Sequence, residues 1–149
     1  DQPFLGERWI GYAHDEIQAL ETSETLRNQT SGLTELRAAR LMITDMRAGE
    51  YLSTDEARAV AQLAEAVRVT RQGLDNYGVG LVASGEMDLV AEAGLNWHDI
   101  AAAVPIVTAA GGMVCDWSSA PLRDTGGPIQ AVVAATPALA QTACQVLQG

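Results

Sequence analysis

The feature that most constrains this chain is its alternation of short apolar runs with longer segments whose apolar residues recur at helical spacing. The runs at 40–44, 112–116 and 131–135 are too short for independent helices and are mainly apolar, which is typical of buried strands. Segments with helical spacing separate them, most clearly at 54–66. Such interleaving is typical of a sheet covered by helices, so it predicts a layered α/β or α+β fold.

The segment at 54–66 carries the clearest start signal of the predicted helices. Ser53 and Glu56 stand at the spacing of a capping box, in which each side chain satisfies a backbone amide of the other residue. The apolar residues that follow recur at helical spacing, at Ala57, Val60, Ala61, Leu63, Ala64 and Val67. We therefore expect a helix over this segment.

The other predicted elements follow the same alternation. Further strands are expected at residues 7–13, 67–70 and 87–91, and further helices at residues 33–38, 75–84, 96–110 and from 137 onward. The polar stretch at 21–31 is interpreted as the edge of a strand and a loop. The helix at 75–84 should end at Gly85, where a left-handed cap suits glycine. Pro105 lacks a backbone donor, so the helix at 96–110 either bends there or begins later.

The 149 residues fit a single domain, and we treat residues 1–149 as one. The 9 basic and 19 acidic side chains give a net charge of −10, and the basic residues form no run. Binding to nucleic-acid phosphates or to anionic membrane surfaces depends on clustered cations, so neither is an expected partner. The longest apolar stretch, from Ile100 to Ala110, is far shorter than the roughly 20 residues of a membrane span.

The two cysteines, Cys115 and Cys144, are isolated in apolar segments. This pattern is typical of small buried hydrophobic side chains rather than of a metal pair or a secreted disulfide framework. We therefore predict a cytoplasmic protein. The chain begins at Asp1 without a charged and apolar leader, so we expect its natural start to have been removed.

Three carboxylates lie close together in sequence across a predicted strand, turn and helix start: Asp88, Glu92 and Asp99. If Asn96 caps the helix, Asp99 lies in its first turn, where unpaired amides and the helix dipole favour anions. A carboxylate there can bind a metal while the neighbouring amides face a phosphate. Oxygen ligands of this kind suit Mg²⁺, which takes one or two protein carboxylates and completes its shell with water and substrate phosphate.

These residues also have structural interpretations, which the residue pattern leaves open. An acidic residue in a first helical turn is commonly only a capping partner. Asp88 and Glu92 can be solvated or salt-bridged residues at strand ends, and His98 can be a surface or capping group. Gly111 and Gly112 are interpreted as a helix stop, because no Lys-Ser or Lys-Thr pair follows them as a P-loop requires.

A longer motif surrounds the predicted helix start and consists of Trp97-His98-Asp99-Ile100-Ala101-Ala102, followed by Gly111-Gly112 and Asp116. It resembles the C-terminal signature of the inositol monophosphatase family, which reads Trp-Asp-x-Ala-Ala, an apolar helix, Ala-Gly-Gly and a strand containing Asp. His98 stands between the Trp and the Asp, a departure that resembles the histidinol-phosphate phosphatase branch. The element Gly73-Leu74-Asp75-Asn76-Tyr77 is similar to the Gly-x-Asp-x-Tyr element of that branch.

The resemblance covers most of residues 5–147 and implies a fold. That fold is the layered αβαβα sandwich of the inositol monophosphatase and fructose-1,6-bisphosphatase type, of which this chain would be the C-terminal portion only. The resemblance implies that Asp99 is the C-terminal metal ligand. It also implies that Glu92 contacts the alcohol portion of the substrate and that Asp75 lies at the substrate-selecting end of its helix. Asp88 is expected to have a structural role.

The same resemblance implies a homodimeric, Mg²⁺-dependent phosphatase that acts on a small phosphorylated alcohol. The expected substrate is histidinol phosphate, which would place the enzyme in histidine biosynthesis, or inositol monophosphate. In the family, most metal ligands come from an N-terminal Glu and an Asp-Pro-Ile-Asp-Gly-Thr or similar segment, and neither occurs in this chain. We therefore expect the N-terminal metal-binding part to be absent from it. Asp99 cannot hold a catalytic Mg²⁺ cluster by itself, so we expect the chain to be inactive alone.

Two alternatives stay open. In one, the chain is a non-catalytic module derived from the family that binds a partner or a small ligand and has lost its metal site. In the other, the phosphatase acts on a sulfated nucleotide or a sugar bisphosphate. The Gly-x-Asp-x-Tyr element at 73–77 favours histidinol phosphate over these substrates.

Overall fold

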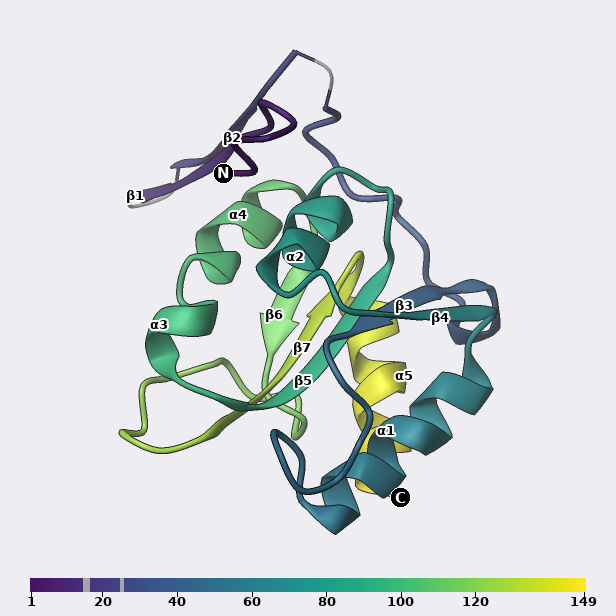
Figure 1. Ribbon diagram of the computed structural model, residues 1–149. Coiled ribbons are helices and arrows are strands. Elements are labelled where there is room, and N and C mark those ends of the chain that lie inside the picture. The colour runs from purple at the N-terminus through teal and green to yellow at the C-terminus, as the bar shows by residue number, and fades with distance from the viewer. Residues whose placement is uncertain (15–16, 25) are drawn as a thin grey trace.

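A five-stranded mixed sheet forms the centre of the computed structural model, which describes residues 1–14, 17–24 and 26–149 (Figure 1). Its strands are β3 (Arg40–Ile43), β4 (Val69–Gln72), β5 (Leu89–Leu95), β6 (Met113–Cys115) and β7 (Ile129–Ala134). They lie side by side in the order β4-β3-β5-β7-β6. β3 is parallel to β4 and β5, whereas β7 is antiparallel to β5 and β6.

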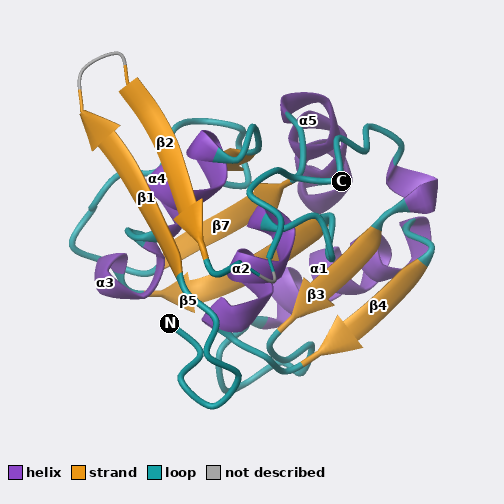
Figure 2. Ribbon diagram, turned by 90° about the horizontal axis from the view of Figure 1, so that it is seen from above, coloured by secondary structure: helices purple, strands orange, loops and turns teal. Residues whose placement is uncertain are grey.

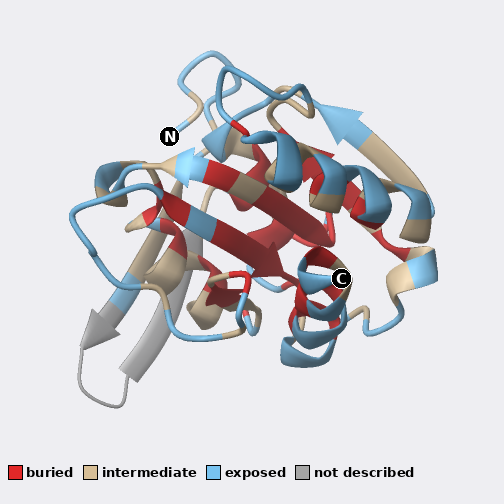
Figure 3. Ribbon diagram, turned by 90° about the horizontal axis from the view of Figure 1, so that it is seen from below, coloured by how far each residue is buried: buried red, intermediate tan, exposed pale blue. Residues whose placement is uncertain are grey.

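Helices cover both faces of this sheet. They are α1 (Thr54–Ala66), α2 (Asn76–Ala83), α3 (Trp97–Ile100), α4 (Ala103–Ala109) and α5 (Pro137–Gln148). α1 and α5 share one buried apolar cluster with Leu41, and α2, α3 and α4 share another with Met42. Adjacent strand residues face opposite sides, so β3, β5, β6 and β7 each contribute to both clusters. The strands in the middle of the sheet are accordingly buried along most of their length (Figure 3).

An antiparallel hairpin of β1 (Trp9–His14) and β2 (Ile17–Thr22) lies beyond α4 and projects from the body of the molecule (Figure 2). Gly11 permits this close packing, because a Cβ there would lie 2.5 Å from a backbone nitrogen of α4. Trp9 ties the hairpin to the loop after α2 by donating from Nε1 to Ser84 Oγ at 2.7 Å. The hairpin therefore adds a further β layer to the helix-sheet-helix body.

Several predicted elements are confirmed. α1 spans the predicted residues, and its capping box is present, since Glu56 N donates to Ser53 Oγ at 3.2 Å and Ser53 N donates to Glu56 Oε2 at 2.8 Å. α2 ends just before Gly85, which has a φ of 76°. β1, β3, β6, β7 and α5 lie within two residues of their predicted bounds.

The helix predicted at 96–110 is two helices, α3 and α4. Ala101 and Ala102 separate them, and Pro105 lies in the first turn of α4. The missing donor of proline is tolerated in a first turn, where it has no intrahelical acceptor. The alternative in which Pro105 marks a later helix start is therefore the correct one.

Other predictions were wrong in part. Residues 33–38 form only a short 3₁₀ turn, Leu36–Ala38, because Arg68 N and Val69 N both donate to the carbonyl of Ala39 and draw the chain into the sheet. The strand predicted at 67–70 therefore lies at 69–72, and the strand at 87–91 continues to Leu95. β2 overlaps the start of the predicted loop at 21–31, of which residue 25 lies outside the described residues.

The layered α/β class is nevertheless the one predicted. Each face of the sheet is covered by helices, and the hairpin adds a layer outside α4. Within the described ranges, none of these helices has the length and apolar character that a membrane span requires.

Candidate functional site

A cavity of about 390 Å³ opens where β3 and β5 end, beside the first turns of α2 and α3. Open sheets with helices on both faces typically bind ligands at the carboxyl ends of their strands. The three residues singled out from the sequence, Asp75, Glu92 and Asp99, all line this cavity. The structure therefore brings together side chains that the sequence places on a strand and at two helix starts.

Glu92 is held on β5 by the end of the neighbouring strand. Thr44, just after β3, donates to Glu92 Oε1 from its backbone N at 2.7 Å and from Oγ1 at 2.8 Å. Burial raises the pKa of Glu92 above its usual range, and the negative charge of Asp75 adds to this rise. Both contacts from Thr44 go to one oxygen, so Oε2 is the atom of Glu92 that remains for a ligand.

Asp75 lies immediately before α2 in a strained stretch of backbone. Its φ is 43°, and Leu74 before it has a φ of 76°. Such φ values are uncommon for residues other than glycine, and they cluster at functional sites. The Asp75 side chain makes no capping hydrogen bond to α2, although capping is the common role of aspartate at this position. The carboxylate therefore lines the cavity instead of closing the helix.

Asp99 lies in the first turn of α3 and uses one oxygen to cap that helix. Its Oδ2 accepts from Asn96 N at 2.8 Å, and its Oδ1 lies 3.4 Å from His98 Nε2. Asn76 Nδ2 donates to the Asp99 carbonyl at 2.8 Å, which fixes the start of α2 against α3. The capping interpretation is thus correct for Oδ2, while Oδ1 accepts no hydrogen bond from the described residues.

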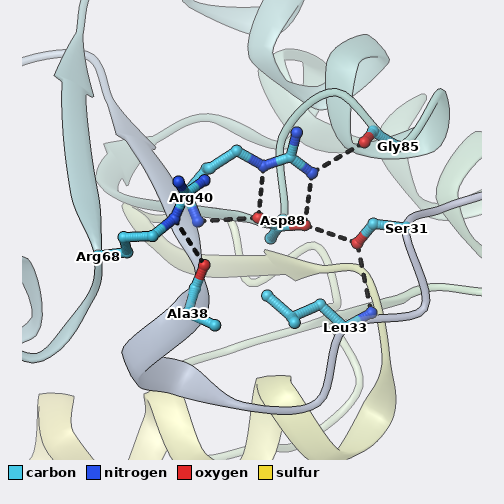
Figure 4. A network of polar contacts seen from close by, with 7 residues as sticks. All are labelled: Ser31, Leu33, Ala38, Arg40, Arg68, Gly85 and Asp88. Carbon is cyan, nitrogen blue, oxygen red and sulfur yellow. Dashed lines mark hydrogen bonds and ion pairs between the residues drawn. The ribbon is translucent and has the colours of Figure 1, made fainter.

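Asp88, at the other end of β5, belongs to a closed polar network (Figure 4). Arg40 donates to it from Nε at 2.7 Å, Nη2 at 2.8 Å and the backbone N at 2.8 Å, and Ser31 Oγ donates at 2.6 Å. Burial alone would raise the pKa of Asp88, but the hydrogen bonds from Arg40 and Ser31 outweigh it and hold that pKa below its usual range. Asp88 therefore has a structural role, as predicted.

The described lining of the cavity does not by itself form a metal site with three or more ligands. In the part of the chain that the structure describes, no three His, Cys, Asp or Glu side chains are grouped so that they could hold a metal ion. Asp99 Oδ1 is a suitable single ligand, because Mg²⁺ often takes only one or two protein carboxylates. Carboxylates in addition to those of the described lining would be needed for a metal cluster.

Sequence reasoning missed three residues that shape the cavity: Thr44, Tyr51 and Asn76. Thr44 had a usable signal, since it is the first polar residue after a buried strand, at the end where ligands bind. Tyr51 had no sequence signal, because it lines the cavity only through the tertiary contact of its loop with β5. A Cβ at Gly94 would lie 2.5 Å from the Tyr51 carbonyl oxygen. Only glycine allows this loop to lie so close to β5.

The chain is thus a layered α/β sandwich with an acidic cavity at the strand ends, and comparisons with known proteins identify its family. The sequence model of the inositol monophosphatase family matches residues 1–148. The chain belongs to this family. Bifunctional phosphatase IMPL2, chloroplastic, from Arabidopsis thaliana is 36% identical to it over 121 residues, which are 79% of this chain and 32% of that protein.

Solved structures agree with this assignment. An inositol monophosphatase from Zymomonas mobilis superposes with a TM-score of 0.86 at 28% identity, covering 100% of this chain and 56% of that one. An inositol monophosphatase from Thermotoga maritima shows the same fold, with a TM-score of 0.76 at 21% identity, over 98% of this chain and 53% of that one. The sandwich implied by the resemblance is confirmed. The chain spans about a third of the IMPL2 sequence and about half of each solved chain.

Proposed function

We propose that the protein containing this chain is a Mg²⁺-dependent phosphatase of a small phosphorylated alcohol, and that this chain is its C-terminal part. Asp99 would supply one metal ligand, and Glu92 and Asp75 would contact the alcohol. The observation that carries the proposal is the convergence of these three carboxylates on one cavity at the strand ends, in a chain of the inositol monophosphatase family. The phosphatase name of the Arabidopsis relative supports it.

Bound Mg²⁺ supplies Lewis-acid chemistry, which activates water and neutralises phosphate charge. The contributions of this chain are positional. The hydrogen bond that Asp99 Oδ2 accepts from Asn96 N fixes the Asp99 side chain beside the cavity, and Oδ1 would be its metal-binding oxygen. Thr44 holds Glu92 so that Oε2 can accept a hydrogen bond from a substrate hydroxyl or ammonium group.

The charge of the cavity favours histidinol phosphate over the other candidate substrates. Its described lining contains Asp75, Glu92 and Asp99 but no Lys, Arg or His. Asp75 and Glu92 would repel the additional phosphate or sulfate of a sugar bisphosphate or a sulfated nucleotide. The same two carboxylates would bind the ammonium group of histidinol phosphate with charge-assisted hydrogen bonds, and an inositol ring offers no such charge.

The proposal is tested by Asp99→Asn in the full-length protein. Asparagine keeps a carbonyl that can accept the Asn96 N–H, so α3 should remain capped while the charged metal ligand is lost. We expect Mg²⁺-dependent phosphate release to fall by at least about a hundredfold, with an unchanged circular dichroism spectrum. The matched control is Asp124→Asn on an exposed loop outside the cavity, which should keep wild-type rates.

The substrates for that assay are histidinol phosphate, inositol monophosphate, a sugar bisphosphate and a phosphorylated nucleotide sulfate. Release from histidinol phosphate should be the fastest. Wild-type rates in Asp99→Asn would contradict the role of Asp99. A folded full-length protein that releases phosphate from none of these esters would contradict the enzyme and favour the non-catalytic module.

A further inference from the structure

Two buried thiols face each other on the side of the sheet away from the candidate site. Cys115 ends β6 and Cys144 lies in α5, and their sulfur atoms are 3.8 Å apart. Cys115 is fully buried and Cys144 is 1% exposed, both within the apolar cluster that α1 and α5 share. The candidate cavity is lined instead by residues of the other cluster, such as Val90 and Val133.

The turn after β6 covers Cys144. Cys144 Sγ donates to the Asp116 carbonyl at 3.4 Å, and Gln148 Nε2 donates to the Trp117 carbonyl at 2.7 Å, so the end of α5 is fastened to this turn. The turn includes Ser119, whose φ of 67° is uncommon for serine. The turn therefore contacts Cys144 through the Asp116 carbonyl and has a strained residue at Ser119.

The two thiols differ in acidity. Hydrogen bonds from Cys115 and from Ser119 lower the pKa of the Cys144 thiol, whereas the same contact and burial raise the pKa of Cys115. Because a thiolate is the reactive form of cysteine, Cys144 is the one that would react first with a peroxide that reaches the pair.

We propose that Cys115 and Cys144 form a modification site at which a small peroxide oxidises the thiol pair to an intramolecular disulfide. The Cys144 thiolate attacks one oxygen of hydrogen peroxide, the O–O bond breaks, hydroxide leaves, and a sulfenic acid remains on Cys144. The Cys115 thiol then attacks that sulfur, the S–O bond breaks, and water leaves as the S–S bond forms. Overall, the two thiols lose two electrons and two protons, and one peroxide becomes two waters.

The cross-link would join the sheet to its covering helix. It connects residues separated by 29 positions in sequence, so it removes conformational freedom from the unfolded chain. Because it lies on the face opposite the cavity, it should leave the candidate site unchanged. The oxidised protein should therefore resist unfolding better than the reduced protein, independently of any phosphatase activity.

The test uses hydrogen peroxide as the probe on the folded, full-length protein. Trypsin cleaves after Arg123 and separates the two cysteines, so a non-reducing digest shows the cross-link as two joined peptides whose mass is two hydrogen atoms short. We expect this species in the wild type, its loss after dithiothreitol, and a higher urea midpoint while it is present. In Cys115→Ser, dimedone should capture a sulfenic acid at Cys144, whereas Cys144→Ser should yield neither product.

Two outcomes would overturn the proposal. One is that both thiols stay free in the folded protein at peroxide concentrations that oxidise free cysteine, or become joined only when urea is added. The other is that the joined peptides form without any rise in the urea midpoint. The wild-type digest decides the first point even if a serine variant fails to fold.

Discussion

Strand β5 has one carboxylate just before its first residue and another in its middle, and their surroundings are opposite in character. Asp88, just before the strand, receives an Arg40 guanidinium, the Arg40 backbone N–H and the Ser31 hydroxyl, and its pKa is lowered. Glu92, within the strand, receives only Thr44 among the described residues, and its pKa is raised. The charge of Asp88 is balanced by these donors, whereas Glu92 holds a charge that burial disfavours.

The difference separates a residue that builds the fold from one that we propose binds a ligand. An ion pair of the Asp88 kind favours the folded chain only while both partners are present. A buried carboxylate without a cation costs stability, and such residues are retained at sites where a ligand supplies the missing charge. The comparison predicts that removing the charge of Asp88 and removing the charge of Glu92 change stability in opposite directions.

The largest effect is expected for Arg40→Met. The Asp88 side chain is only 2% exposed, so its charge would be buried without a counter-ion. We expect the free energy of unfolding to fall by about 3 to 5 kcal/mol, measured from urea midpoints near neutral pH.

Arg58→Met is the matched control for that substitution. It breaks the Arg58–Asp55 pair, whose side chains are 66% and 88% exposed, so we expect a loss of no more than about 0.5 kcal/mol. Equal losses in the two variants would contradict the structural role of the Asp88 network.

Features that depend on residues close together in sequence could be predicted, whereas the contacts of Asp88 and Glu92 could not. The capping box of α1, the Gly85 stop of α2 and the first-turn position of Asp99 depend on residues a few positions apart, which local patterns describe. The Arg40–Asp88 and Thr44–Glu92 contacts each join residues 48 positions apart. They exist because β3 and β5 are neighbours in the sheet, and no local pattern contains that pairing.

The residues of the candidate site could likewise be predicted only in part from local sequence patterns. Residue chemistry alone singled out Glu92 and Asp99 but left both open to a structural role, and Asp75 was named only because the family resemblance implied its role. Tyr51 enters the cavity through the close approach to Gly94, which is a property of the packed chain. The positive φ values of Leu74 and Asp75 are likewise not contained in a local sequence pattern.

A smaller loss is expected for Asp88→Asn. The substitution removes the carboxylate but leaves an amide that can still bind Arg40, whose side chain is 28% exposed, so we expect a loss of about 2 kcal/mol near neutral pH. Because the pKa of Asp88 is lower in the folded state, the wild type loses this advantage as pH falls below 3.8 through the folded value. Urea midpoints of the two proteins should therefore converge in acid, and a gap independent of pH would contradict the ion pair.

Glu92→Gln should have the opposite sign. The folded state holds the Glu92 proton more tightly than the unfolded chain, so the wild type loses stability as pH rises from 4.5 through the folded pKa. Glutamine has no charge to bury, and we expect a gain of up to about 1 kcal/mol near neutral pH that vanishes near pH 4. Glu65→Gln, on the exposed face of α1, should leave the free energy of unfolding unchanged both near neutral pH and near pH 4. A loss of stability in Glu92→Gln at neutral pH would contradict the comparison.

The smallest effect tests how Glu92 is held. Thr44→Val keeps the backbone N–H donor and the shape of the side chain but removes the hydroxyl that donates to Glu92 Oε1, whereas Thr44→Ser keeps both donors. With one fewer hydrogen bond to the charged form, the pKa of Glu92 should rise further in Thr44→Val, and stability near neutral pH should fall by about 0.5 kcal/mol. The measurement is the pH titration of the Glu92 carboxyl carbon by NMR, in which the serine variant should match the wild type. If both variants shift that titration equally, the hydroxyl does not hold Glu92, and the backbone contact alone positions it.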